Sequence, residues 1–461
     1  MQSENPNRKG LQTLSKKVKQ TSAFWIALAL ALMMGPGCAT YSDKMKLAQE
    51  QVVAGNYKLA VDELNTFMGV NENELPTKFN SNTALALLDR ATIEQAQSDF
   101  KNSARDFGVA DEELQLLDIS NDTVGQIGKY LISDSSTKYK ASPVEKLALN
   151  GFNMMNYLAM GQLTGASVEA RRFTVMRDYL TNFDPGHPHA AFGSYLAGFT
   201  FAQQKDYGRA MRYYDEALEA GALESLREPV SRLAKLTSYR GKNVTKFLSE
   251  KSTPPTPSDH TSSLLVVVGV GRVPYKVPER MPIGAAIGVA GSYITGNPAV
   301  LGYSAFKVVI YPELVQPPSI YNSVRIQVDD QPTPIDLATN LGVEIKNEYE
   351  AIKPKIVGAA ISRLIVRAAA AEAAREAGNQ QSPALGWALA LATEAGMVSM
   401  DKPDTRSWMF LPSRVYVYQT QLKPGTHTVA VQLGKSKEDL VRQTVDIKSN
   451  GFAAIVITAP R

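Results

Sequence analysis

Along residues 42–245, apolar side chains recur every three to four positions, a spacing that predicts one helix after another. The clearest unit is 190–221, in which Phe201, Tyr207 and Tyr214 fall, together with small residues, at the spacings of a tetratricopeptide repeat. The small residues allow two antiparallel helices to approach closely, and the tyrosines fill the gap beside them. This segment is therefore predicted to be a helix pair.

Further copies of the pattern precede that unit. One lies at 47–67 and includes Tyr57, and a weaker one lies around Phe100. Residues 145–180 predict another helix pair without the signature. The equivalent aromatic positions are not separated by multiples of about 34 residues, so insertions must interrupt any tandem array.

Helix pairs of this kind cannot bury their apolar faces alone and stack into a solenoid with a concave surface. We therefore expect residues 38–250 to form a tetratricopeptide-like solenoid that binds another protein, with a rigid spacer as the alternative. The candidate protein-binding residues are the aromatic positions of the repeats, Tyr57, Phe100, Phe201, Tyr207 and Tyr214.

Residues 251–262 are rich in Pro, Ser and Thr and predict a linker, because they can hold neither a helix nor a central strand. Residues 263–461 then change period and predict a β-rich, sandwich-like domain. Its expected strands are 264–270, 306–310, 323–328, 414–420, 426–433, 441–447 and 452–458. The whole chain is thus predicted to be α+β.

Residues 343–396 interrupt these strands with a helical period and predict a hairpin of two helices packed on a sheet. The first helix is expected to begin at Pro354, because a proline in the first turn loses no hydrogen bond. The second is expected at 383–396. Contact of this hairpin with a membrane is the alternative.

Two shorter patterns concern loops. Residues 422–427 place Pro and Gly for a tight turn and predict a β-hairpin between the flanking strands. Residues 282–296 carry four glycines among small apolar residues. They indicate either a flexible insertion that orders on a partner or membrane, or a disordered loop.

The composition excludes two classes of protein and one class of partner. With 461 residues, 44% hydrophobic and 20% charged, the chain is neither disordered nor a polytopic membrane protein. Residues 1–37 hold five of the 49 basic residues but one of the 45 acidic residues, which leaves 44 of each in the remaining chain. A neutral mature chain has no electrostatic footprint for nucleic acid.

The basic start leads into an apolar run at 24–34 that is shorter than the roughly 20 residues of a membrane span. The run ends in Gly-Pro-Gly before Cys38, the only cysteine, which is the layout of a signal peptide over 1–37. These residues resemble a bacterial lipobox. The resemblance implies acylation of Cys38, and Ala39 in place of Asp implies sorting to the outer membrane, facing the periplasm. An ordinary cleaved signal or an uncleaved anchor is the alternative.

No arrangement typical of an enzyme is present. The tract 269–274 has Pro274 where a dinucleotide loop needs a glycine, and 187–189 (His-Pro-His) is expected to be a loop rather than a metal site. We therefore expect no catalytic residue, no cofactor and no metal. Isolated carboxylates such as Glu279 and Asp329-Asp330 keep open the alternative of an enzyme that acts on cell-wall or glycan material.

The densest polar cluster contains Asp404, Arg406 and Trp408. Arg offers a fork for carboxylates and Trp a stacking face, so these residues are a candidate recognition patch, for example on a carbohydrate-binding module. The alternative is a structural corner in which Asp404 caps backbone amides and Trp408 fills the sheet.

Taken together, three features resemble a family of functionally uncharacterised proteobacterial outer-membrane lipoproteins with tetratricopeptide-like repeats. They are the lipidated repeat region, the tract Val-Pro-Tyr-Lys-Val-Pro-Glu at 273–279, and Asp404-Thr-Arg-Ser-Trp408 followed by Pro-Gly-Thr-His at 424–427. The resemblance implies a setting close to the peptidoglycan-synthesis machinery and supplies no catalytic residue. The sequence thus predicts a membrane-anchored scaffold that binds envelope proteins in cell-envelope assembly or maintenance.

Overall fold

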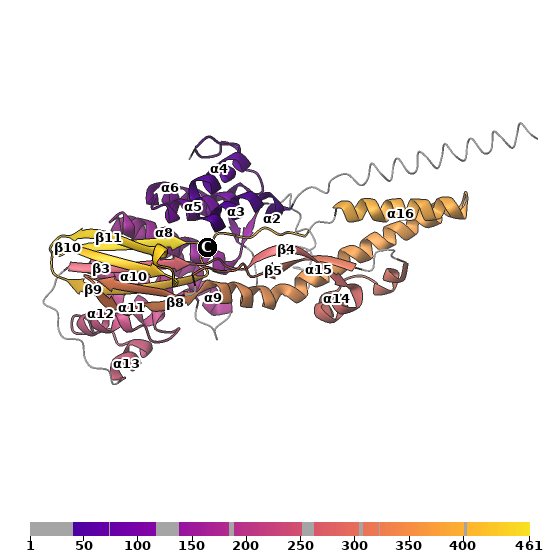
Figure 1. Cartoon of the computed structure of the whole chain (residues 1–461). Helices are drawn as coiled ribbons and strands as arrows, with labels where there is room; N and C mark the ends of the chain where they lie inside the picture. Colours follow the sequence, from indigo (N-terminus) through magenta and orange to yellow (C-terminus); the bar gives the residue numbers. More distant parts are fainter. Residues whose placement is uncertain are drawn as a thin grey trace, which may run out of the picture.

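The first half of the chain is helical, and the second half combines sheets with a protruding helical arm (Figure 1). The computed structural model describes residues 40–72, 74–116, 138–183, 189–250, 262–303, 308–321, 323–400 and 403–461. The predicted mixed α+β class is confirmed. Within these ranges, no helix combines the length and the apolar character needed to cross a membrane.

In the described ranges, the helical half contains four pairs of helices packed side by side. They are α3 (Lys46–Ala54) with α4 (Tyr57–Met68), α5 (Thr83–Ala96) with α6 (Phe100–Glu113), α8 (Pro143–Ala159) with α9 (Leu163–Phe183), and α10 (Ala191–Gln203) with α11 (Tyr207–Ala217). Each segment for which the sequence predicts a helix pair forms one. The smaller elements are α2 (Tyr41–Lys44), β1 (Gln115–Leu116), β2 (Lys140–Ala141), η1 (Glu224–Leu226), α12 (Arg227–Leu233) and α13 (Lys242–Ser249).

The four pairs share one turn geometry. Each turn contains a residue with positive φ that donates its N–H to the carbonyl three residues earlier, while the next residue donates to the carbonyl five residues before it. These two hydrogen bonds close the end of the first helix as a Schellman motif. The residues with positive φ are Gly55, Ser98, Gly161 and Lys205. Only the two glycines mark the turn in the sequence.

The strands form two four-stranded sheets that face each other. The first has the order β12 (Phe452–Ala459), β3 (Ser262–Val270), β9 (Arg414–Leu422) and β8 (Asp336–Asn340), and the second has the order β11 (Leu440–Ile447), β10 (Gly425–Leu433), β6 (Val324–Val328) and β7 (Gln331–Thr333). Strand β3 pairs parallel with β12 and antiparallel with β9. Valine, leucine and isoleucine side chains of β3, β6 and β10 fill the space between the sheets.

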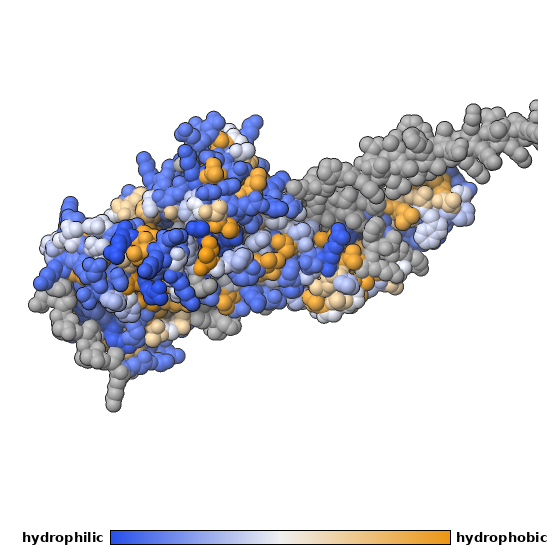
Figure 2. All heavy atoms as spheres, in the orientation of Figure 1, coloured by the Kyte–Doolittle hydropathy of each residue, from blue (hydrophilic) through white to orange (hydrophobic). Residues whose placement is uncertain are grey.

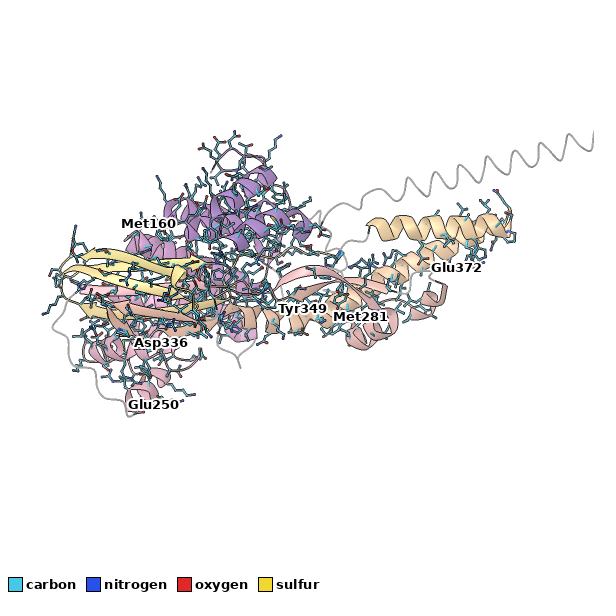
Figure 3. The ribbon with its side chains drawn as sticks, viewed as in Figure 1. Met160, Glu250, Met281, Asp336, Tyr349 and Glu372 are labelled. Carbon is cyan, nitrogen blue, oxygen red and sulfur yellow. The ribbon has the colours of Figure 1, made fainter. Side chains whose placement is uncertain are left out.

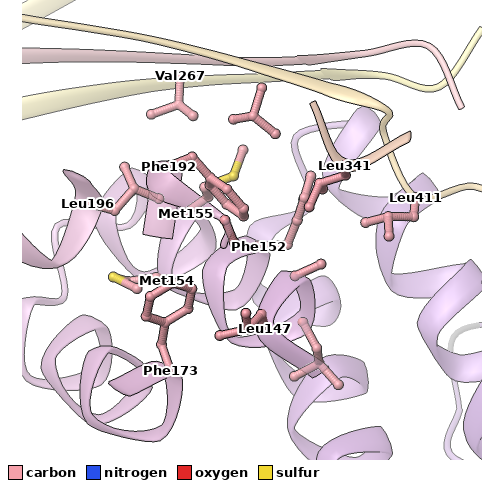
Figure 4. Close-up of a cluster of buried hydrophobic side chains, with 14 of the residues drawn as sticks. Leu147, Phe152, Met154, Met155, Phe173, Phe192, Leu196, Val267, Leu341 and Leu411 are labelled. Atoms are coloured by element: carbon pink, nitrogen blue, oxygen red, sulfur yellow. The ribbon is translucent and has the colours of Figure 1, made fainter. Parts of the chain in front are cut away.

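The helical half covers the other side of the first sheet. Leu265 and Val267 of β3 point away from the second sheet and join Phe152, Phe192 and other helical side chains in one apolar core (Figure 4). Strand β3 is therefore buried on both faces, which explains its uninterrupted apolar sequence. The helices and the sheets share this core.

The turn at 422–427 is a correction to the sequence prediction. Strand β9 ends at Leu422 and β10 begins at Gly425, but the two strands belong to different sheets and do not pair. Gly425, with φ +138°, lets the chain pass from one sheet to the other. The Pro-Gly turn thus forms a corner of the sandwich.

The protruding arm is a pair of long helices, α15 (Leu341–Asn379) and α16 (Pro383–Met400). The start predicted at Pro354 is wrong. The helix begins 13 residues earlier, where the Asn340 side chain accepts a hydrogen bond from the Val343 N–H, and Pro354 lies inside it. Buried Leu341 and Ile352 tie the stretch before the proline to the body, and the Tyr349 hydroxyl donates to the Pro312 carbonyl. This packing offsets the lost hydrogen bond.

The middle of α15 carries its own small core. Strands β4 (Tyr275–Pro282) and β5 (Val308–Val315) pair into a ribbon, and α14 (Ile283–Ala290), η2 (Gly291–Tyr293) and η3 (Pro298–Tyr303) connect them. Alanines of α14 meet the predicted apolar stripe of α15, which includes Val357, Ile361 and Leu364. Most of the glycine-rich stretch, residues 283–293, is therefore helical, and α14 packs on α15 instead of forming a disordered loop.

Candidate functional site

The described chain is fixed to the body from its first residue. Thr40 caps α2 through a reciprocal pair of hydrogen bonds with Asp43, one of which joins Thr40 N and Asp43 Oδ2 at 2.9 Å. The Thr40 hydroxyl and, to a smaller extent, the Thr40 N–H donate to Asp43 Oδ2 and lower the pKa of Asp43. The next residue, Tyr41, is buried, and its hydroxyl donates to Asp89 Oδ2 at 2.8 Å. Cys38 itself lies outside the described residues, two positions before Thr40.

Helix α2 and α3 contact an extended segment, residues 403–413, which we call the strap. Ser42 Oγ donates to Thr405 Oγ1 at 3.3 Å, and Gln49 Nε2 approaches the Met409 sulfur at 3.1 Å. Two residues, 401 and 402, separate the end of helix α16 from the start of the strap. The start of the described chain therefore lies beside the point where the arm rejoins the body.

Within the strap, Asp404 and Arg406 form a bidentate ion pair. Arg406 Nε and Nη2 donate to the two oxygens of Asp404 at 2.7 and 2.6 Å, and the Arg406 backbone N–H donates to Oδ1. Burial raises the pKa of Asp404, but the bonds from Arg406 outweigh it and hold the pKa below the usual value. Arg406 also donates to the Ser81 carbonyl and lies over the Tyr139 ring. The guanidinium is buried and its fork is filled from within the chain.

Trp408 is 0% exposed. Its indole N–H donates to Thr92 Oγ1 at 2.9 Å, and its ring packs edge-on against Phe107 and Phe152. The accessible recognition patch expected from Asp404, Arg406 and Trp408 is therefore not what this segment forms. A sugar cannot stack on a ring that has no exposed surface, so the structure places Trp408 at the joint between the helical half and the strap.

Two buried carboxylates that sequence reasoning missed hold the strap in place. Asp89 Oδ1 accepts the backbone N–H groups of Met409 and Phe410 at 2.9 and 3.2 Å, and Glu145 Oε1 accepts that of Trp408 at 3.1 Å. An extended segment has no ladder of its own, so its buried N–H groups need such acceptors. The position of Asp89 inside the mostly apolar run 84–93 is the sequence signal from which its burial could have been predicted.

The environment of Asp89 favours its protonated form. Burial, with a smaller contribution from the charge of Glu145, raises the pKa of Asp89 to about 7, although hydrogen bonds from Tyr41 and the strap act in the opposite direction. Glu145 receives two further donors at its other oxygen, the Tyr139 hydroxyl at 2.6 Å and the Ser142 N–H at 2.9 Å. Both carboxylates therefore satisfy donors of the fold itself.

The aromatic positions of the repeats serve the interior. Phe201 and Tyr214 are buried, and Tyr57, Phe100 and Tyr207 are partly buried against the same core. The Tyr214 hydroxyl donates to Gln419 Oε1 of β9 at 3.2 Å, which links the fourth helix pair to the sheet. The prediction that Phe201 and Tyr214 contact a partner directly is wrong, because neither side chain reaches the surface.

The inner side of the helix pairs is covered by the protein itself. Helices α5, α8 and α10, the first helices of the last three pairs, pack on strands of the first sheet. A second protein cannot occupy the same space. The concave binding surface expected from the repeats is thus taken by the chain's own sheet, which satisfies the apolar faces that the pairs leave open.

Asp329 and Asp330, two of the carboxylates that kept the enzyme alternative open, have local structural roles. Asp329 and Asp330 both have positive φ in the turn between β6 and β7. Asp329 Oδ2 lies 2.7 Å from His427 Nδ1, and Asp330 pairs with Arg442 at 3.6 Å. Among the described residues, no three His, Cys, Asp or Glu side chains are placed to hold a metal ion.

The sequence leaves membrane contact of the helical hairpin open as an alternative without naming its residues, and the structure shows which apolar side chains of the arm are exposed. In α16, Leu385, Trp387, Leu389 and Leu391 are exposed, with Trp387 at 58%, and Figure 2 shows apolar residues gathered at this protruding end. The single charged residue of the helix, Glu394, is 2% exposed. The outward surface of α16 is therefore apolar and uncharged.

The position of this surface follows from how α16 packs on α15. Figure 3 labels Asp336, Tyr349 and Glu372 in order from the sheets to the protruding end. There a Cβ on Gly378 would lie 2.7 Å from the Gly386 Cα, so only glycine permits the crossing. The Arg375 guanidinium lies over the Trp387 ring, 5.6 Å from its centroid.

In comparisons with known proteins, no family model matches this chain, and no curated protein or solved structure is found to be similar.

Proposed function

We propose that this protein is an outer-membrane lipoprotein that faces the periplasm, is anchored through acylated Cys38, and acts as a non-catalytic scaffold in cell-envelope assembly or maintenance. The leader and the lipobox-like tract before Cys38 support the anchor. Asp89 and Glu145, the buried carboxylates that hold the strap, support a non-catalytic role, because they are engaged with backbone and hydroxyl donors of the fold.

One observation carries the proposal: very few residues separate Cys38 from the folded body. Thr40 already caps α2, and Tyr41 is locked to Asp89 in the core. Two residues span at most about 7 Å, so acyl chains on Cys38 begin within that distance of α2. The anchor therefore holds the body close to the bilayer and limits how it can turn, which suits a scaffold that presents a fixed surface.

The partner surface then lies on the outside of the helix pairs. Their shared turn geometry supports the proposal that they are tetratricopeptide-like repeats, whose inner faces are used by the sheet. Leu47, Val53 and Leu59 of the first pair are exposed, and this pair directly follows α2. We propose that an envelope protein contacts this pair, and the family resemblance suggests the peptidoglycan-synthesis machinery.

The anchor is tested with Cys38→Ser. The unmodified protein is expected to incorporate radiolabelled palmitate and to fractionate with the outer membrane, and the variant to lose the label. Equal membrane retention together with no label in the unmodified protein would remove the basis of the proposal.

The partner surface is tested in intact cells by placing a photo-crosslinking amino acid at Leu59, with Val175 of α9, which is also exposed, as the matched control position. A discrete crosslinked envelope protein is expected from position 59 and not from position 175. A flexible insertion of about ten Gly and Ser residues between Ala39 and Thr40 is expected to keep the label and weaken this crosslink. Identical products from both positions would contradict the assignment.

A further inference from the structure

The outward surface of α16 lacks the polar groups found in ordinary protein interfaces. Residues 383–392 contain no polar side chain apart from the indole N–H of Trp387. Gly386, Ala390 and Glu394 form the buried side toward α15, and the exposed side chains occupy the rest of the circumference. Interfaces between proteins carry about one hydrogen bond per 100–200 Å². A surface that offers almost none matches an acyl-chain environment better.

A second uncharged stretch lies in the same arm. Residues 281–306 contain no charged residue, whereas a chain with 20% charged residues would place about five in that length. Part of this stretch is α14, which exposes Ile287 and packs on α15. The arm therefore contains two charge-poor segments that expose apolar side chains. Residues 147–168 of the helical half also lack charged residues, but the side chains of 147–156 are buried.

We propose that the arm is a second membrane contact, in which α16 lies in the bilayer interface with Leu385, Trp387, Leu389 and Leu391 among the acyl chains. This inference rests on the proposed anchor, because a tether of about 7 Å keeps the body next to the lipid. The strap, which α16 joins through two residues, touches α2, so the arm starts beside the attachment point (Figure 1).

The arm lies on the bilayer and does not span it. Neither helix meets the requirements of a membrane span in the described ranges, and α15 carries charges along its length, including Glu372 and Arg375. Trp387 with the Arg375 guanidinium over its ring is the combination of aromatic and snorkelling basic side chain that is enriched where acyl chains meet headgroups. An interfacial helix with one apolar side fits this geometry.

Fluorescence of Trp387 provides a direct readout. Trp25 lies in the leader and is replaced by Phe, and Trp408 is fully buried, so changes in quenching report on Trp387. The acylated protein is reconstituted into phosphatidylethanolamine and phosphatidylglycerol vesicles with ordinary or with brominated acyl chains. We expect brominated lipid to quench Trp387 and both vesicle types to shield it from iodide, at low and at high salt because no basic cluster is involved.

Leu389→Glu is expected to abolish the quenching by brominated lipid, and Val175→Glu, which places the same charge on the exposed surface of α9, is expected to leave it unchanged. Iodide access that is as high in vesicles as in urea-unfolded protein overturns the proposal. Shielding that grows with protein density in ordinary vesicles, without quenching by brominated lipid, overturns it in favour of a second copy.

The two proposals can fail separately. Palmitate labelling of Cys38 decides the anchor, whereas quenching of Trp387 decides the arm. A labelled protein whose Trp387 stays accessible to iodide keeps the anchor and removes the arm contact. An unlabelled protein whose Trp387 is quenched in membranes keeps the arm contact and removes the anchor.

Discussion

The helical half and the arm are built from the same unit, two helices packed side by side, yet they treat their remaining surface differently. In the helical half, α5, α8 and α10 pack on the first sheet, and the joint is filled by Trp408 and neighbouring core residues. In the arm, α16 packs on α15 and exposes the rest of its apolar surface.

This difference shows that a helix pair is an incomplete structure. Two helices bury only the stripe between them, and any further apolar surface needs a third layer. The chain provides that layer for the helical half and leaves it to the surroundings for the arm. The apolar side chains of the helical half therefore contribute to folding, whereas those of α16 would, under our proposal, contribute to membrane binding.

The two tryptophans give the largest contrast. Trp408→Ala empties a fully buried site and leaves the Thr92 hydroxyl without its donor, so we expect it to lower the free energy of unfolding by about 3–5 kcal/mol. Trp387→Ala removes an exposed side chain and is expected to change the free energy of unfolding by less than about 0.5 kcal/mol. Urea denaturation of both variants measures this, and equal effects would mean that the arm is part of the folded core.

The joint between helices and strap should also respond to pH through Asp89. Its pKa is raised from 3.8 to about 7, so the folded protein holds the proton more tightly than the unfolded chain. The resulting stability is complete below the unfolded pKa and is lost as the pH rises through about 7.

We therefore expect the free energy of unfolding of the unmodified protein to fall, relative to Asp89→Asn, by on the order of 2–4 kcal/mol between pH 4 and pH 8. Urea denaturation at a series of pH values gives the difference, and the other carboxylates cancel because both proteins carry them. A pH-independent difference would show that the three hydrogen-bond donors keep Asp89 ionised.

The smallest expected effect concerns the crossing of α15 and α16. Gly378→Ala places a methyl group against the backbone of Gly386 and is expected to loosen α16 locally, by roughly 1–3 kcal/mol. Hydrogen exchange of α16 amides measures the change, and exchange in the helical half should stay as it was. Gly288→Ala on α14 meets open space and serves as the control. Faster exchange throughout the body would contradict the independence of the arm.

Much of the secondary structure could be predicted from the sequence, because local periodicity reflects which side of an element is buried. The helix pairs of the first half and strand β3 have strong local patterns, and the prediction of both was correct. The start of α15 could not be predicted, because packing of Leu341 and Ile352 on the body overrides the local preference of Pro354. Likewise, the Pro-Gly turn at 424–425 specifies a reversal but does not specify which sheet receives the next strand.

The candidate sites followed the same division. Asp404, Arg406 and Trp408 have the composition of a recognition patch, and only their burial shows that Arg406 is saturated and Trp408 inaccessible. Conversely, the leucines of α16 read locally like those of any core helix. Their exposure depends on the absence of a covering element, which no local pattern encodes.

By itself, the sequence determined the basic and apolar run that ends before Cys38, the equal numbers of acidic and basic residues after residue 37, and the identity of most helices and strands. Each of these depends on residues that lie close together in the chain. The tertiary structure alone decided that the helix pairs cover one face of the first sheet, that buried Asp89 and Glu145 hold the strap, and that no described element covers the outward side of α16. These outcomes depend on segments hundreds of residues apart meeting in space. Whether a side chain is buried, and whether its hydrogen-bonding groups find partners, is decided only when these segments pack together.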